Sequence, residues 1–458
     1  MSHTSQHGDR LSLQQKLAYG VGDLGTAITT NLIAFFLMPF FTDVAAISPG
    51  IAGGILFAGK VWDALNDPII GVLTDKTRTR WGRRRPWLLF SAIPFGLSFA
   101  ALWWIPFPKE QNALVIYYFV VNLLFNTFFT AVNLPYSALT TELTQDYDER
   151  TSLNNFRFAF SIGGSVVSAV LHPSIVRQFG ENQALGYLGA GIFWAVVSTV
   201  PVFICFLGTR ERYHLPEEST PLWQQFRSTF SNIPYLCVIG IYICSWLALQ
   251  ATATVIPYYV RYWVRPPNPE EVIPLAILAV QGTAFFMLFV WSKVSAWIGK
   301  KAVFVWGCSA WIAAQLGLFV LQPQQVVFMY VLAVLAGVGV ATAYLVPWAM
   351  LPDVVDLDEL HTGKRREGIY YGFMVILQKF ALAGALFGIG FALEQAGFVL
   401  PVGQIPVLAQ PSAVLQVLRF LIAPVPAVLL ILGIILASFY PITKEKHQEI
   451  VALLSAQK

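Results

Sequence analysis

The sequence predicts an all-α membrane protein with twelve transmembrane helices, and three observations lead to that fold class. The 458 residues are 56% hydrophobic and only 12% charged, whereas roughly a quarter of a soluble domain is charged. The chain contains twelve largely apolar segments of the length, about 20 residues, that a bilayer requires. Basic residues gather in the connections on one side of these segments.

Each apolar segment is expected to be a helix, because backbone groups in lipid must bond within their own segment. The expected spans are 17–42, 50–74, 87–106, 113–139, 156–174, 186–207, 234–259, 273–291, 302–321, 326–350, 369–393 and 413–440. The longest connection separates six spans from six. The predicted domains are an N-terminal tail (1–16), a six-helix bundle (17–207), a linker (208–233), a second bundle (234–440) and a C-terminal tail (441–458).

The distribution of basic residues predicts the topology. Of the 29 Lys and Arg residues, 22 lie in segments that share a side with the N-terminus, and only 4 lie in the opposite loops. Positive charge marks the cytoplasmic side. We therefore expect a multi-pass protein of the inner or plasma membrane with both termini in the cytoplasm. No basic stripe with interleaved aromatic residues points to nucleic acid.

Short internal matches indicate a duplication. The run WGRR at 81–84 resembles IGKK at 298–301, and LPYSAL at 134–139 resembles VPWAML at 346–351. The two pairs have nearly the same offset, as expected for two related halves. Two six-helix halves related about an axis along the membrane normal form the architecture of the major facilitator superfamily.

An acid pair inside the second span is the strongest functional signal. Asp63 and Asp67 are four residues apart and so share one helical face. Each charge at mid-membrane costs at least about 2.5–3.5 kcal/mol, so a bound monovalent cation or shared proton would stabilise the pair. Pro68 also frees the carbonyl of Ala64. The alternative is that Asp63 pairs with Lys60 while Asp67 is solvated at the end of the span.

Three other charged residues sit at or within spans. Lys379 in span 11 is expected to face a wet cavity or a partner carboxylate. Asp23 follows two glycines in span 1 and is either a solute ligand or a helix-packing residue. Arg157 opens span 5, where a topology anchor and a cavity role fit equally well. The loops at 75–86 and 353–367 mix acids and bases, either as salt bridges between the halves or as surface pairs.

The sequence carries no phosphate-binding loop and no nucleophile–base pattern. We therefore expect a secondary transporter, not an enzyme or an ATP-driven pump, with no cofactor other than its coupling cation.

Several motifs resemble one family. They are KLAYGVGD at 16–23, WDALNDP at 62–68, TRWGR at 79–83, PYSAL at 135–139, ERTSL at 149–153 and LPDVVD at 351–356. Together they resemble the glycoside–pentoside–hexuronide:cation symporters of the major facilitator superfamily, to which the melibiose permease belongs. The resemblance covers nearly the whole chain.

The resemblance implies symport with Na⁺, H⁺ or Li⁺. It assigns the cation site to Asp63 and Asp67 together with Thr130 and Asn133, where Asn133 stands in place of a third family acid. For the solute it implies Arg157 and Lys379, and Tyr344 falls where the melibiose permease has a tryptophan. The acid that this permease uses in span 1 falls on Ala27, so Asp23 is the acid left to complete the cavity.

A second branch shares the WDA and PYSAL motifs. The sodium-dependent lysophospholipid symporters resemble the chain there and around 347–354, and they also lack the span 4 acid. The leading hypothesis is a cation symporter for a small, sugar-type solute that works by alternating access. A lysophospholipid or amphiphile transporter is the alternative, and a membrane scaffold or sensor is the third possibility.

Overall fold

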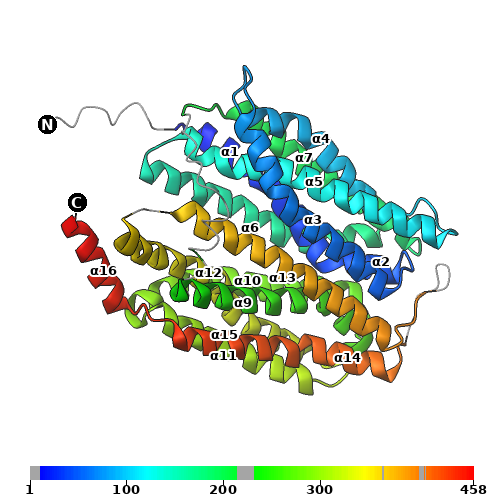
Figure 1. Cartoon of the computed structure of the whole chain (residues 1–458). Helices are drawn as coiled ribbons and strands as arrows, with labels where there is room; N and C mark the ends of the chain where they lie inside the picture. Colours follow the sequence, from blue (N-terminus) through cyan, green and yellow to red (C-terminus); the bar gives the residue numbers. More distant parts are fainter. Residues whose placement is uncertain are drawn as a thin grey trace. The chain divides into compact units, whose positions relative to one another are not determined.

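The computed structural model describes residues 11–213, 229, 232–363, 366–401, 407 and 409–457, and these residues are almost entirely helical (Figure 1). Two compact units divide the chain. The first comprises Met1–Glu217 with Val399–Val407, and the second comprises Glu218–Phe398 with Leu408–Lys458. Of the predicted linker, residues 214–228, 230 and 231 lie outside the described residues, as do 1–10 of the N-terminal tail and 364–365 of the predicted loop.

The first unit holds the helices that correspond to the first six predicted spans. They are α1 (Leu13–Leu32), η1 (Ile33–Leu37), α2 (Met38–Asp43), α3 (Pro49–Lys76), α4 (Arg85–Ala101), α5 (Gln111–Leu143), α6 (Tyr147–Arg177) and α7 (Gln183–Gly208). Helix α1 packs against α6 and α7, α3 packs against α5, and α4 packs against α5 and α7.

The second unit holds the helices of the last six predicted spans and one more. They are α9 (Ile233–Tyr258), η2 (Tyr259–Val264), α10 (Pro269–Ile298), α11 (Lys300–Val320), α12 (Val326–Thr362), α13 (Glu367–Gln395), α14 (Ser412–Ile422), α15 (Pro424–Phe439) and α16 (Lys444–Gln457). Here α12 packs against α10 and α11, and α9 packs against α13 and α15.

Ten helical stretches within the described residues are long and apolar enough to cross a membrane. The two further predicted spans are also helices. Helix α4 has 17 residues, and α3 carries Lys60, Asp63 and Asp67 among its apolar residues. The all-α membrane fold predicted from composition is therefore confirmed.

Two details of the sequence prediction are wrong. Residues 353–362, expected in a loop, continue helix α12 through Pro347 and Pro352. Helix α6 begins at Tyr147, so Arg157 lies inside a helix and does not open it. In both cases the apolar run is shorter than the helix, because helix ends in water carry charged residues. The predicted C-terminal tail contains helix α16.

The duplication has structural counterparts. Gly82 and Gly299 both have positive φ, 102° and 84°, and each precedes basic residues at a helix start. The first span of each unit also contains a π-helical segment, η1 at Ile33–Leu37 and η2 at Tyr259–Val264. π-Helical segments are rare and are frequent at functional sites.

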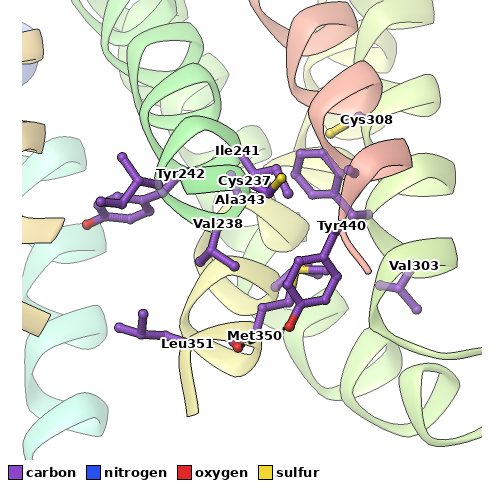
Figure 2. Close-up of a cluster of buried hydrophobic side chains, with 14 of the residues drawn as sticks. Cys237, Val238, Ile241, Tyr242, Val303, Cys308, Ala343, Met350, Leu351 and Tyr440 are labelled. Atoms are coloured by element: carbon purple, nitrogen blue, oxygen red, sulfur yellow. Dashed lines mark hydrogen bonds between the residues drawn. The ribbon is translucent and has the colours of Figure 1, made fainter. Parts of the chain in front are cut away.

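The core of the second unit is built from side chains of α9, α11, α12 and α15 together with Tyr440 (Figure 2). Cys237 and Cys308 are buried in it as free thiols, in keeping with cysteine as a small apolar residue.

Candidate functional site

Three hydrogen bonds fix how α3 and α5 lie against one another. Asn122 donates to the carbonyl of Ile55 at 2.7 Å, the Trp62 indole donates to Thr127 at 2.8 Å, and Thr130 bonds to Asp63 at 2.9 Å. Their partners are separated by 67, 65 and 67 residues. A constant separation means that the two helices run parallel and stay in one register.

The acid pair lies on this interface. The Thr130 hydroxyl lies 2.9 Å from Oδ1 of Asp63 and 3.2 Å from Oδ1 of Asp67. Asp63 is only 2% exposed, and Asp67 is half-buried. The structure therefore brings three of the four predicted cation-site residues together.

Lys60 also contacts the pair. Its ammonium lies 3.6 Å from Oδ2 of Asp63, so the ion pair foreseen as the alternative reading exists beside the Thr130 contact. Two carboxylates and one ammonium leave one net negative charge at this site.

Two asparagines flank the acids. Asn133, the fourth predicted residue, is half-buried one helical turn beyond Thr130. Asn66 lies between the two acids in sequence and is buried, and its Nδ2 finds no hydrogen-bond partner among the described residues. Orphaned buried donors are uncommon in native structures.

The predicted solute residues Asp23 and Arg157 form a partly buried ion pair. Nε of Arg157 lies 3.1 Å from Oδ2 of Asp23, and Thr26 donates to the other carboxylate oxygen at 3.2 Å. The guanidinium also lies over the ring of Tyr136 at 5.4 Å. The structure thus joins two residues that sequence reasoning treated separately.

Glycines on both sides of Asp23 let α1 pack closely against its neighbours. A Cβ on Gly22 would come within 2.6 Å of the Tyr136 ring, and one on Gly25 within 2.1 Å of the Ser198 carbonyl. Only glycine lets α1 approach its neighbours this closely. The spacing KLAYGVGDLG therefore serves packing as well as placing the carboxylate.

In the second unit, Lys379 is half-buried on α13, and the adjacent Gln378 accepts a hydrogen bond from Tyr242 at 2.9 Å. Tyr344 lies edge-on to Trp246, with ring centroids 5.6 Å apart. A small pocket between α9 and α13 is lined by Ile243, Trp246, Leu247, Gln378, Ala381 and Leu382. The indole nitrogen of Trp246 is buried, with no hydrogen-bond partner in the part of the chain that the structure describes.

Charged residues at the helix ends form one network in each unit. In the first, Arg83 and Arg84 reach Oε1 of Glu142 at 2.7 and 3.1 Å. In the second, Lys300 lies 2.7 Å from Oδ1 of Asp353, which His447 of α16 also contacts at 3.3 Å. Each unit therefore carries the same kind of ion pair near its two matched segments: Arg83 and Lys300 correspond, and the two acids lie one position apart in the alignment.

Arg366, at the start of α13, is held by Asp358 at 2.6 Å. Hydrogen bonding to this carboxylate raises the pKa of the guanidinium, which therefore stays charged over the physiological range.

The model of one family, the MFS/sugar transport proteins, matches residues 18–444. The chain belongs to this family. An uncharacterized symporter of Synechocystis is 42% identical to this transporter, with 99% of the present chain and 98% of the relative covered. Sodium-dependent lysophosphatidylcholine symporter 1 of Mus musculus is 31% identical, with 96% and 88% covered.

The fold comparison agrees with the family. A solved structure of a mutant of the nucleoside transporter NupG aligns with a TM-score of 0.66 at 11% identity, covering 96% of this transporter and 100% of that chain. At this identity the likeness concerns the fold alone. The predicted major facilitator fold, the cation symporter family and the multi-pass membrane character are confirmed, and the transporter is not an enzyme.

Proposed function

We propose that this transporter is a symporter in which Asp63, Asp67 and Thr130 bind the coupling cation. The observation that carries the proposal is the contact of one hydroxyl with both carboxylates. A hydroxyl has one proton and can donate to only one acid at a time. Two carboxylates that share one hydroxyl lie close together and repel one another, and a bound cation or proton would offset that repulsion.

The solute class in this proposal is a sugar or glycoside. The family description supports it. The residues proposed to contact the solute are Asp23, Arg157, Tyr344 and Lys379. In the same proposal both termini are cytoplasmic, and the membrane is the inner or plasma membrane.

A lysophospholipid is the second candidate solute. The mouse relative that carries this name is 31% identical over nearly the full chain, an observation that favours an amphiphile as directly as the family description favours a sugar.

Uptake into proteoliposomes tests the proposal. The purified transporter would receive a Na⁺ or H⁺ gradient and a panel of radiolabelled glycosides and lysophospholipids. We expect gradient-driven uptake of one class that is lost in the double variant D63N/D67N. Glu449→Gln is the matched control, because it removes an exposed carboxylate paired with Lys446. Uptake that survives D63N/D67N would refute the cation site.

A further inference from the structure

A row of polar residues extends from the acid site along one face of helix α5. Asn122, Asn126 and Thr130 are spaced four residues apart, and all three are buried. Positions at this spacing lie on one stripe of a helix. The row begins where Asn122 bonds to the Ile55 carbonyl and ends where Thr130 meets the two acids.

The register of α3 and α5 locates the middle member of the row. The hydrogen bonds on either side of Asn126 join residues separated by 63 to 67 positions. With that separation, Asn126 lies opposite the turn of α3 at 59–63. Gly59 leaves room there, since a Cβ on it would fall 2.1 Å from Nδ2 of Asn122. Asn126 therefore lies between the Asn122–Ile55 contact and the contacts of Thr130 with the two acids.

The orientation of the Asn126 amide is fixed by its donors. Its Nδ2 donates to the backbone oxygen of Asn122 at 2.7 Å and to Oδ1 of Asn122 at 3.1 Å. Only the nitrogen of an amide can donate, so the nitrogen faces Asn122 and the oxygen is turned away from it. Asn126 is 2% exposed, and this oxygen has no hydrogen-bond partner among the described residues.

A buried oxygen without a donor carries the full cost of its lost hydration. Here the orphaned oxygen belongs to a residue one turn before Thr130, whose hydroxyl contacts the two carboxylates. Neutral amide oxygens and carboxylates together are the ligand set of hard cations, and transporters complete such sites with uncharged oxygens. An alkali cation at the acid pair would give the orphaned Asn126 oxygen a positive partner. Because an amide oxygen is neutral, it can act as a ligand without adding negative charge to the membrane interior.

We propose that Oδ1 of Asn126 is a ligand of the coupling cation, and that Asn122 positions it. The inference rests on the proposed cation symport and narrows it, because a proton needs no shell of neutral oxygens. It therefore assigns the site to a dehydrated alkali cation, Na⁺ or Li⁺.

The test is a thermal-shift titration of the purified full chain with NaCl or LiCl, with choline chloride at equal ionic strength as the salt reference. A cation that binds only the folded state raises the unfolding temperature. We expect N126A to weaken the apparent Na⁺ affinity by about tenfold or more, as for a lost bond to a charged group. The matched control is N31A, which removes another intramembrane asparagine whose Nδ2 bonds to the Ser165 carbonyl at 2.8 Å; its Na⁺ affinity should equal that of the wild type.

N126D separates a ligand from a structural hydrogen bond. At alkaline pH the aspartate keeps an oxygen but cannot donate to Asn122, so a ligand role predicts Na⁺ affinity at or above the wild-type level. Loss of affinity in N126D would overturn the inference. If N126A does not fold, N126D alone decides by the same criterion.

The remaining outcomes distinguish the inference from the proposed function. Wild-type Na⁺ affinity in N126A, together with loss in D63N, would overturn the ligand role of Asn126 and leave the acid site intact. Wild-type affinity in D63N would contradict the acid site itself. If neither Na⁺ nor Li⁺ raises the unfolding temperature of the wild-type protein, but a proton gradient drives uptake, the alkali-cation site is refuted. Proton symport by this transporter would then remain supported.

Discussion

The hydroxyl of Thr130 lies 2.9 Å from Asp63 and 3.2 Å from Asp67 and so links the two acids of α3 to helix α5. Replacing Thr130 with Val keeps the shape and removes the oxygen. Because hydrogen bonds to charged groups contribute about 1.5–3 kcal/mol, we expect T130V to weaken cation affinity about tenfold. T130S, which retains the hydroxyl, is the control and should stay close to the wild type. Cation-dependent uptake and the thermal-shift titration measure both, and equal loss in the two variants would show that the oxygen is not the active group.

The Asp23–Arg157 pair leads to a prediction about stability. D23A leaves the guanidinium without its carboxylate inside the bundle. Breaking a fully buried pair costs about 3–5 kcal/mol, and we expect less here because 22% of the Arg157 side chain is exposed. D23A should lower the unfolding temperature more than the double variant D23A/R157A does, because the double variant leaves no unpaired charge.

A double-mutant cycle in detergent measures this coupling. Additive losses would mean that the two side chains do not stabilise one another. Solute binding by the same variants then reports separately on their proposed role as ligands.

Much of this site could be predicted from the sequence, because a charged residue in an apolar run is conspicuous. Asp63, Asp67, Asp23 and Lys379 stand out for that reason. Asn126 does not, because a single amide in a membrane helix gives no comparable signal. The spacing of Asn122, Asn126 and Thr130 is visible in the sequence, yet only the register with α3 shows that the row meets the acid pair.

The helix ends were harder to predict than the spans. The α6 start had a usable signal, because Asp146 caps the helix by accepting a bond from the Glu149 amide at 2.9 Å. The α12 end had none, since Pro347 and Pro352 argue for an early stop and yet lie within the helix. In membrane proteins proline is tolerated within a helix because neighbouring helices satisfy the backbone groups that it leaves without a hydrogen bond. This effect depends on tertiary packing and cannot be read from the local sequence.

Two glycines of α3 provide a matched pair of substitutions. A Cβ on Gly59 would fall 2.1 Å from Nδ2 of Asn122, whereas one on Gly54 would meet nothing within 4 Å. G59A should therefore displace Asn122 from the Ile55 carbonyl and weaken cation binding, while G54A should be neutral. Cation titrations of the two variants check this. Equal affinities would mean that the α3–α5 interface adjusts without cost.

Adjacent lysines provide a second matched pair. Lys300 bonds to both carboxylate oxygens of Asp353 at 2.7 Å, while Lys301 bonds only to the Ser438 carbonyl. Asp353 is 4% exposed, so K300M leaves a buried carboxylate short of its main counter-charge. We expect K300M to lower the unfolding temperature clearly and K301M to change it little. A similar temperature for both would assign the stabilisation of Asp353 to His447 instead.

Lys60 leads to a prediction of opposite sign. Its ammonium lies 3.6 Å from Asp63 and so competes with any cation for the same carboxylate. Removing it in K60M raises the net negative charge of the site from one to two. Attraction for a cation then increases, and we expect tighter Na⁺ binding and slower release, with a lower rate of cation-coupled uptake. K60R keeps the charge and should preserve wild-type affinity. Weaker Na⁺ binding in K60M would instead mean that the lysine holds Asp63 in its binding geometry, and that its positive charge organises the site more than it opposes the cation.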